Sequence, residues 1–416
     1  MKGWFLLVFI GTTMQAVGLD FILLDIYRQA PEGWASNVLA VISLQFLPRL
    51  LRALIFGGIG VGCVVFGILR LNRTILRPFL QPGSTPVVDT LVKYRRRDRG
   101  PNVVVIGGGH GLSTVLRGMK EYTSNLTAIV TVADDGGSSG KLRQSKGMLP
   151  PGDIRNCLAA LSNDEDLTSQ LFQYRFSPDE SNLEGHSFGN LLISALAEIT
   201  GSFEKAVVEA GKVLSVRGQV VPSTLHDVRL VADKSVPNLR REVRVKGESQ
   251  IPGVSGKVRR LWLEPNAPQA YPTAVRALLA ADMIVVGPGS LYTSILPNLL
   301  VPDIAAALKS SQGFKVFVCN VTTQPGETDN YDCGDHLDAI EAHVDGYLFD
   351  MVVASNQRNG ELPEMLQWVE AAPDLDGEYA VYRADLTSEE QPLRHDGEKL
   401  AKALIDLLME RTGPLV

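Results

Sequence analysis

The sequence of 416 residues contains only four cysteines, Cys63, Cys157, Cys319 and Cys333, and no two of them form a C-x-x-C pair. This spacing gives no zinc-ligand motif, and it gives no set of closely spaced cysteines like those of small disulfide-stabilised proteins. We therefore expect four reduced thiols, with Cys63 inside a membrane segment and the other three in a cytosolic environment.

The larger part of the chain has no excess of basic charge. Residues 100–416 contain 28 Lys and Arg against 41 Asp and Glu. Binding to a nucleic-acid backbone requires a basic surface, so we do not expect nucleic acid as a partner. The first 99 residues are different, because they contain 12 Lys and Arg against 5 Asp and Glu.

Two apolar segments near the N-terminus, residues 3–19 and 53–69, contain no charged side chain. Each has about 17 residues, which is the lower limit for crossing a bilayer. We interpret residues 1–78 as a membrane hairpin with these two segments as helices; one span plus an interfacial first segment is the alternative. The basic run 93–99 after the second segment places the main domain on the cytoplasmic side of the inner membrane. Residues 79–100 are interpreted as a basic linker.

From residue 101 onward, short apolar runs alternate with helical patterns. Strands are predicted at 103–106, 127–132, 283–286, 315–318 and 346–353, and helices at 112–122, 189–200, 203–213 and 271–280. This alternation is typical of an α/β domain with a Rossmann-like, doubly wound and mostly parallel sheet. Residues 214–264, with strand-like runs that include 219–221, are predicted to form a small antiparallel insertion within the domain 101–416.

The first predicted strand leads directly into a glycine-rich turn and then a helix. Such a turn leaves backbone N–H groups and the positive end of the helix dipole facing a crevice, where they attract a phosphate. The turn departs from the dinucleotide fingerprint G-x-G-x-x-G, because Leu112 stands where the last glycine is required. An ordinary nicotinamide dehydrogenase is therefore disfavoured. The candidate phosphate-binding residues are Gly107, Gly108, Gly109, His110, Gly111 and Ser113.

Adjacent carboxylates follow the second predicted strand. Asp134 and Asp135 precede glycines and hydroxyls, which is typical of a loop. They could hold ribose hydroxyls, a base or Mg²⁺, whereas an Asx turn that ends the strand is the alternative. Ser138 and Ser139 in the same loop are further candidates.

Two further clusters combine charged and amide side chains. Asp153 can cap the helix that follows it, and one turn inside that helix Arg155 and Asn156 could reach an anionic ligand. Ser187 is a candidate N-cap for the next apolar helix, so that His186 and Asn190 would face the same crevice.

A second strand-to-glycine turn, residues 285–294, is predicted to face the first one. Doubly wound sheets bind ligands where two such turns meet at the carboxyl ends of the strands. Another polar loop, residues 320–328, follows the strand after that. The candidate residues from these two loops are Gly287, Gly289, Ser290, Gln324 and Glu327.

These motifs resemble, in the same order along the chain, the gluconeogenesis factor family (YvcK-like), which is related to the 2-phospho-L-lactate transferases (CofD-like). The resemblance rests on residues 106–113, 131–140, 151–156, 185–192, 287–294 and 324–329. The long Ala-Asp-Asp-Gly-Gly-Ser-Ser-Gly version of the second motif, residues 133–140, is similar to the gluconeogenesis factors rather than the transferases. His110 departs from the pattern, because many members carry threonine there.

The resemblance implies a Rossmann-like protein that binds a UDP-sugar such as UDP-N-acetylglucosamine, or an NAD(P)-type dinucleotide. It further implies a regulatory role in cell shape and wall synthesis during gluconeogenic growth. The alternative is a Mg²⁺-dependent transferase that moves a phosphate-linked group from a nucleoside-diphosphate donor, with Asp134 or Asp135 on the metal and His186 or Asn190 orienting an acceptor. A homo-oligomer is a possibility that the sequence leaves open.

Overall fold

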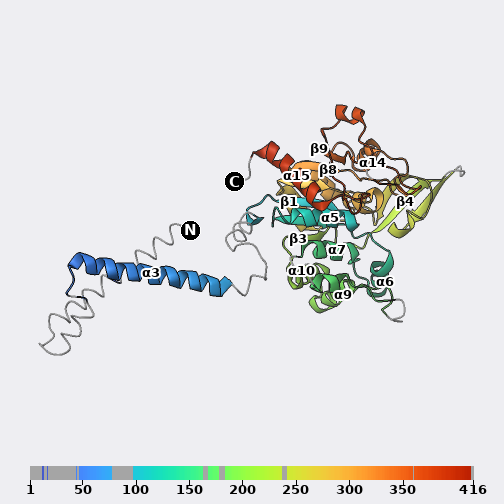
Figure 1. Cartoon of the computed structure of the whole chain (residues 1–416). Helices are drawn as coiled ribbons and strands as arrows, with labels where there is room; N and C mark the ends of the chain where they lie inside the picture. The colour runs from blue at the N-terminus through green and yellow to red at the C-terminus, as the bar shows by residue number, and fades with distance from the viewer. Residues whose placement is uncertain are drawn as a thin grey trace. The chain divides into compact units, whose positions relative to one another are not determined.

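The computed structural model describes Thr12, Thr13, Ala16, Leu44 and residues 46–76, 97–162, 167–177, 183–236, 241–358 and 360–413. The chain forms two compact units, Met1–Thr90 and Leu91–Val416. In the first unit, helix α3 (Arg49–Leu76), blue in Figure 1, contains the predicted membrane segment 53–69. Nearly all of the other predicted segment, residues 3–19, and most of the predicted linker lie outside the described residues.

No single helix among the described residues combines the length and apolar composition of a membrane span. One bent pair of helices, Leu291–Leu299 with Pro302–Ser310, meets both criteria together, by length and composition alone. The membrane hairpin, the linker and the cytoplasmic orientation therefore stay predictions.

The second unit is built on a seven-stranded sheet in the order β10-β9-β8-β7-β1-β2-β3, and every neighbouring pair is parallel. The chain moves outward from β1 to β3 in one direction and then restarts at β7 on the other side of β1. This is the doubly wound, Rossmann-like arrangement that the sequence predicted. The strands are β1 (Val103–Gly107), β2 (Leu126–Val130), β3 (Gln219–Pro222), β7 (Met283–Val286), β8 (Phe314–Val318), β9 (Met351–Ser355) and β10 (Val381–Ala384).

Both faces of the sheet are covered by helices, which explains why β1 and β7 at its centre contain no polar side chain. Along β1, Val103 and Val105 belong to one apolar core, and Val104 and Ile106 to the other, because successive side chains point to opposite faces. The helices are α5 (Gly109–Met119), α6 (Gly137–Lys146), α7 (Gly152–Leu161), α8 (Leu167–Gln173), α9 (Phe188–Thr200), α10 (Phe203–Val213), α11 (Pro272–Leu279), α12 (Leu296–Leu299), α13 (Pro302–Ser310), α14 (Cys333–Val344) and α15 (Gly397–Thr412). Figure 1 shows α7, α9 and α10 grouped on one side of the sheet. The three cysteines of this unit, Cys157, Cys319 and Cys333, are free thiols, as predicted, and all three are buried.

The predicted antiparallel insertion is present but begins later than expected. Strands β4 (Arg229–Ser235), β5 (Glu242–Lys246) and β6 (Lys257–Glu264) form a separate sheet in the order β5-β4-β6. Residues 219–221, which the sequence assigned to the insertion, instead form β3 and pair in parallel with β2. Val220 and Val221 are buried there, so this short apolar run completes the edge of the main sheet.

Two other element boundaries differ from the predicted ones. Strand β9 starts five residues after the predicted Gly346, which has a positive φ of 109° and lies in the preceding turn. Residues 137–140, expected in a loop, form the first turn of α6.

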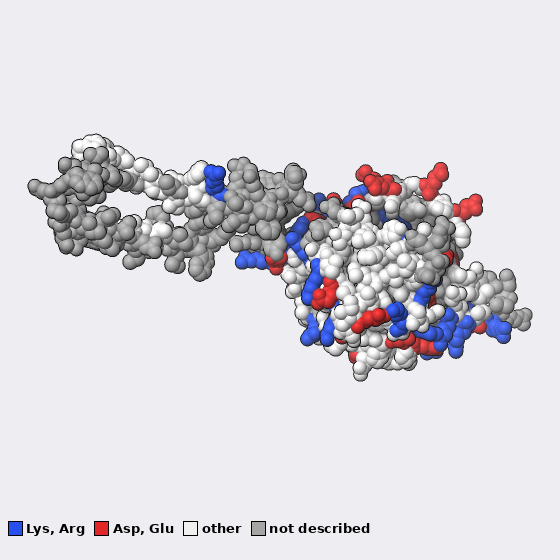
Figure 2. All heavy atoms as spheres, turned by 90° about the horizontal axis from the view of Figure 1, so that it is seen from below, with Lys and Arg blue, Asp and Glu red and all other residues white. Residues whose placement is uncertain are grey.

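On the face drawn in Figure 2, basic and acidic side chains of the second unit are mixed around an area with few charges.

Candidate functional site

The two predicted glycine turns meet at the point where the strand order reverses. Helix α5 begins at Gly109 after β1, and the turn Gly287–Gly289 follows the neighbouring strand β7. A Cβ atom on Gly111 would collide with the carbonyl oxygen of Pro288, so the two backbones are in direct contact. The prediction that these turns face each other is confirmed, and they form the base of the main cleft.

Amide side chains from two other segments hold the turns in place. Asn320 Oδ1 accepts from the Gly289 N–H at 3.0 Å, and its Nδ2 donates to the Gly289 carbonyl at 2.9 Å. Asn298 Nδ2 donates to the Gly107 carbonyl at 3.0 Å. Gln324 Nε2 donates to Ser290 Oγ at 2.7 Å. The backbone of both turns is therefore fixed before any ligand arrives.

Both turns also present the positive end of a helix. Neither α5 nor the π-helical turn η3 (Leu291–Ile295) has an acidic residue in its first turn or a cap bond from its own N-cap side chain. From α7, the Asp153 carboxylate accepts from the Gly109 N–H, which leaves the next N–H groups of α5 for a ligand. The backbone N–H groups at a helix N-terminus favour an anion. This end of the cleft is therefore suited to a phosphate group.

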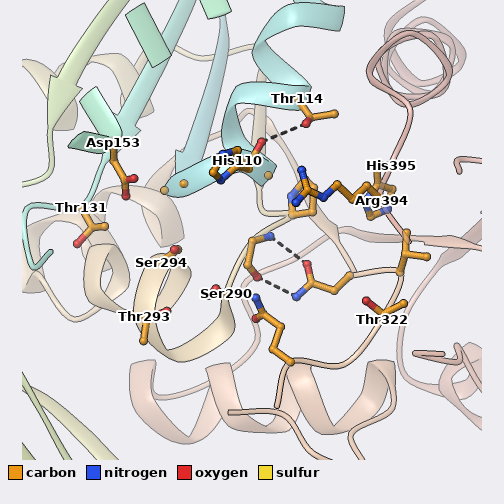
Figure 3. A pocket seen from close by; sticks show the side chains of 18 of the residues that line it. His110, Thr114, Thr131, Asp153, Ser290, Thr293, Ser294, Thr322, Arg394 and His395 are labelled. Carbon is orange, nitrogen blue, oxygen red and sulfur yellow. Dashed lines mark hydrogen bonds between the residues drawn. The ribbon is translucent and has the colours of Figure 1, made fainter. Parts of the chain in front are cut away.

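The main cleft has a volume of about 470 Å³. In Figure 3, His110 lies between Asp153 on one side and Arg394 and His395 on the other. Of the predicted residues, it is lined by Gly108, Gly109, His110, Gly111, Asp134, Asp153, Gly289, Ser290 and Gln324. Lining residues that sequence reasoning missed as candidates include Thr114, Thr131, Glu248, Thr293, Ser294, Asn320, Thr322, Arg394 and His395.

Of the predicted residues that do not line the main cleft, four help to build it. Ser113 donates its hydroxyl to the Gly109 carbonyl at 3.1 Å, within its own helix. Gly107 is the last residue of β1, and Gly287 has a positive φ of 79° that shapes the second turn. Glu327 is buried and accepts from Thr293 Oγ1 at 3.1 Å. These four residues build the walls of the cleft rather than its surface.

The segment before α15 brings a cation and a neutral imidazole to the cleft. Arg394 is exposed, and among the described residues no ion-pair partner of it is found. His395 is buried, its Nε2 has no partner, and burial lowers its pKa to about 4. Burial and the nearby Arg394 charge also lower the pKa of His110. Both histidines are therefore neutral at pH 7 and can donate or accept hydrogen bonds.

Three carboxylates gather on the opposite wall. Burial, and after it the Asp134 charge, raise the pKa of Asp153 to about 6. Burial raises the pKa of Asp134, whose Oδ1 accepts from the Gly136 N–H at 2.8 Å. Burial and the charges of Asp134 and Asp153 raise the pKa of Glu248, from turn η2 (Glu248–Gln250), to about 8. This wall therefore favours a proton or a cation.

Two interpretations of the acidic motifs need correction. Asp153 was expected as a possible cap of α7, but that helix has Pro151 at its N-cap and no side-chain cap bond. Asp134 or Asp135 was expected to hold Mg²⁺, with both as candidate ligand-binding residues. Asp135 does not line the main cleft, and its Oδ1 accepts from the Ser249 N–H at 2.9 Å. Asp134 makes the Asx turn that was the alternative and still lines the cleft.

No group of three or more His, Cys, Asp or Glu side chains in the described part of the chain is arranged to hold a metal ion. Mg²⁺ is usually bound by one or two carboxylates together with ligand phosphates and water. Asp134 and Asp153 have the donor chemistry for that mode, since both are desolvated carboxylates beside a phosphate-type turn. The pair that fits Mg²⁺ is therefore Asp134 with Asp153.

The remaining predicted residues surround a second, smaller cavity of about 230 Å³. It is lined by Ser138, Ser139, Arg155, Asn156 and Asn190, together with Asp134 and Asp153 from the wall of the main cleft. His186 lies beside it, with Nδ1 3.0 Å from Ser138 Oγ. Ser187 caps α9 as predicted, because its hydroxyl accepts from the Asn190 N–H at 3.3 Å.

Residues 136–140 and 185–189 both match the letters G-x-S-x-G of a hydrolase nucleophile elbow. Neither stands on the strand-to-helix turn that the elbow requires, because no named strand ends directly before them. Ser187 is fully buried and used as a cap. The geometry therefore does not support a serine hydrolase.

Comparison with known proteins gives consistent matches. The family model described as "2-phospho-L-lactate transferase CofD" matches residues 103–410. A protein named "Putative gluconeogenesis factor" from Nostoc sp. is 43% identical, over 97% of this chain and 90% of its own length. The "Gluconeogenesis factor" of Bacillus subtilis is 43% identical, over 74% of this chain and 99% of its own length. A crystal structure of a UPF0052 family protein from Bacillus halodurans is 42% identical, with a TM-score of 0.68 over 74% of this chain and 99% of that chain.

Proposed function

The chain belongs to the CofD family and, within it, to the gluconeogenesis factors, and from that premise we propose that its main cleft binds a nucleoside-diphosphate-linked ligand such as UDP-N-acetylglucosamine. The bound protein would act as a regulator of cell shape and wall synthesis under gluconeogenic growth. An NAD(P)-type dinucleotide would use the same turns, but Leu112 departs from the dinucleotide fingerprint.

One observation carries this proposal: the N-termini of α5 and η3, neither of them bonded by its own N-cap side chain, meet backbone to backbone at the switch point, with a cation opposite them. The diphosphate would lie on the N–H groups of His110, Gly111 and Ser290, within reach of Arg394. The cleft volume of about 470 Å³ falls in the range of roughly 300–1,000 Å³ that is usual for small-molecule sites. The amide bonds from Asn320 fix the second turn, so little ordering is needed on binding.

The first prediction tests this assignment through Arg394. The variant Arg394→Gln should bind UDP-N-acetylglucosamine about 10- to 100-fold more weakly, because a hydrogen bond to a charged group contributes about 1.5–3 kcal/mol. Isothermal titration calorimetry on the full chain measures the affinity. Arg276→Gln, an exposed arginine on α11 outside the cleft, is the matched control. No measurable affinity of the wild-type chain for UDP-N-acetylglucosamine and related UDP-sugars would refute the proposal.

A transferase is the second candidate, and the Asp134–Asp153 wall favours it. Mg²⁺ held there with the ligand phosphates would neutralise charge on the diphosphate and orient it. Arg394 would bind the donor from the other wall, and His110, neutral at pH 7, could accept a proton from an acceptor hydroxyl. The acceptor oxygen would form a new P–O bond to the distal phosphorus of the donor while the P–O–P link breaks, and the nucleoside monophosphate would leave.

The second prediction separates the transferase from the regulator. If the chain is a transferase, it should release nucleoside monophosphate from a nucleoside-diphosphate-linked donor, and this activity should depend on Mg²⁺. The activity should fall at least 100-fold in Asp153→Asn, because the acidic wall would then have lost one of its two candidate Mg²⁺ ligands. Asp135→Asn should retain most of the transferase activity, since the Asp135 carboxylate is bonded to the Ser249 N–H and does not line the cleft. Chromatography of the released nucleotide is the measurement. Turnover that persists in excess chelator, or that is lost only in Asp135→Asn, would argue against this assignment.

A further inference from the structure

Three of the sequence motifs are only partly explained by the main cleft. Residues 136–139, 153–156 and 186–190 come together around the smaller cavity instead. Its volume of about 230 Å³ is below the roughly 300 Å³ at which small-molecule sites usually begin. A single small group would fit it, whereas a nucleotide would not.

Arg155 is the central side chain of this cavity. It is only 4% exposed, and its Nε and Nη1 atoms have no hydrogen-bond partner among the described residues. Its Nη2 donates to Asn156 Oδ1 at 2.8 Å, which is a neutral acceptor. A buried guanidinium without a bonded carboxylate costs free energy, so its presence calls for an anion that completes the site.

The neighbouring glycine is needed to place this guanidinium. A Cβ on Gly189 would lie 2.9 Å from both Cγ and Cδ of Arg155, which is closer than real Cβ contacts. The glycine of the 185–190 motif therefore leaves room for the arginine stem. The next residue of the same motif, Asn190, lines the cavity itself.

Asn190 is a second buried polar group without a full set of partners. It is 2% exposed; its Nδ2 donates to Ser138 Oγ at 3.0 Å, and within the part of the chain that the structure describes its Oδ1 has no partner. Rotating the amide by 180° keeps a bond to Ser138 and leaves Nδ2 available to a ligand oxygen. The amide, like the guanidinium, can thus donate into the cavity.

The start of α6 adds a third source of positive potential. This ten-residue helix has Gly136 at its N-cap, no side-chain cap bond and no acidic residue in its first turn. Arg175 lines the rim of the cavity, and burial together with the Arg175 charge lowers the pKa of Arg155 to about 10. The carboxylates of Asp134 and Asp153 act on Arg155 in the opposite direction, but no hydrogen bond between Arg155 and either of them is present among the described residues.

We propose that the smaller cavity is an oxyanion site, in which Arg155, Asn190 and the N-terminus of α6 bind the phosphate or carboxylate group of a second small ligand. Asp134 and Asp153 line both cavities, so this second ligand lies next to the one in the main cleft. The site binds an acceptor or an effector at the same time as the nucleotide. Binding of the oxyanion in the smaller cavity does not depend on which ligand the main cleft holds.

The test is a titration of the full chain with inorganic phosphate, with and without saturating UDP-N-acetylglucosamine. We expect one phosphate site per chain that remains when the main cleft is filled. Asn190→Asp places a negative charge in the cavity with almost no change of shape, and it should weaken phosphate binding at least 10-fold. Arg155→Gln should also weaken phosphate binding at least 10-fold. Asn356→Asp, an exposed asparagine after β9, is the matched control.

A parallel titration with acetate identifies the source of the oxyanion. Binding of acetate as well as phosphate indicates a carboxylic-acid ligand, whereas binding of phosphate alone indicates a phosphate ester. Loss of the phosphate site when UDP-N-acetylglucosamine is added, or in Arg394→Gln, would overturn the proposal, because the ion would then belong to the main cleft. Equal phosphate affinity in wild type and Asn190→Asp would overturn it too. Failure of UDP-N-acetylglucosamine to bind affects only the proposed function.

Discussion

Gly111→Ala is expected to abolish ligand binding in the main cleft, whereas Gly107→Ala, four residues earlier in the same glycine run, should leave it intact. A Cβ at Gly111 would run into the Pro288 carbonyl and so force the two turns apart. A Cβ at Gly107 would meet Leu112 Cβ at 3.6 Å, an ordinary van der Waals distance. The two substitutions add the same methyl group, so the contrast between them isolates the contact between the turns.

Stability should change in the same direction as binding. Overpacking a tight contact typically costs about 1–3 kcal/mol, so Gly111→Ala should lower the free energy of unfolding by roughly that amount. Urea unfolding followed by circular dichroism measures this cost, and calorimetry with UDP-N-acetylglucosamine measures the affinity. If Gly111→Ala binds the ligand as well as Gly107→Ala does, the cleft does not depend on the contact between the turns.

The base of the main cleft could be predicted from the sequence because it consists of backbone. A strand that ends in glycines and restarts as a helix has few alternatives, and the parallel sheet then aligns such turns at one edge. Gly108–Gly111 and Gly289–Ser290 accordingly line the main cleft, and their role in ligand binding stays a prediction. The position of Gly111 against Pro288 also explains why this turn contains more glycines than phosphate binding alone requires.

The side-chain walls could not be predicted in the same way. Arg394 and His395 precede α15 in an unremarkable polar segment, and Glu248 lies in a short turn of the insertion. They reach the cleft only through long-range packing, for example the contact of Gly397, at the start of α15, with Thr114 of α5. Asp135 shows the opposite case: it has the right chemistry at the right strand end, but its backbone direction points it toward Ser249.

The pH dependence of stability is the last prediction, and its largest contribution should come from Glu248. Its folded-state pKa of about 8 lies above the ordinary glutamate value of 4.5, so the folded state holds this proton more tightly than the unfolded state. Stability from this group is fully present below about pH 4.5 and is lost as the pH rises toward 8. The contribution of Asp153 to stability is lost at lower pH, between pH 3.8 and about pH 6.

Between about pH 6.5 and 8, then, Glu248 should set the slope of the wild-type curve, at up to about 1.4 kcal/mol per pH unit. Glu248→Gln should flatten that slope and be more stable than wild type by about 1–3 kcal/mol at pH 9. Urea unfolding across this range measures both effects. Glu364→Gln, an exposed glutamate, serves as the control and should follow the wild-type curve. Parallel slopes for wild type and Glu248→Gln would show that Glu248 is not desolvated.

A protein that lowers its own stability at neutral pH with buried carboxylates needs a compensating gain from binding. Glu248 and Asp153 both face the main cleft, where a divalent cation or a ligand hydroxyl would replace the missing proton. Addition of Mg²⁺ together with a diphosphate ligand should therefore stabilise the wild-type protein more at pH 8 than at pH 6. The same addition should stabilise Asp153→Asn less than wild type at pH 8, because that variant has one carboxylate fewer to offer the cation.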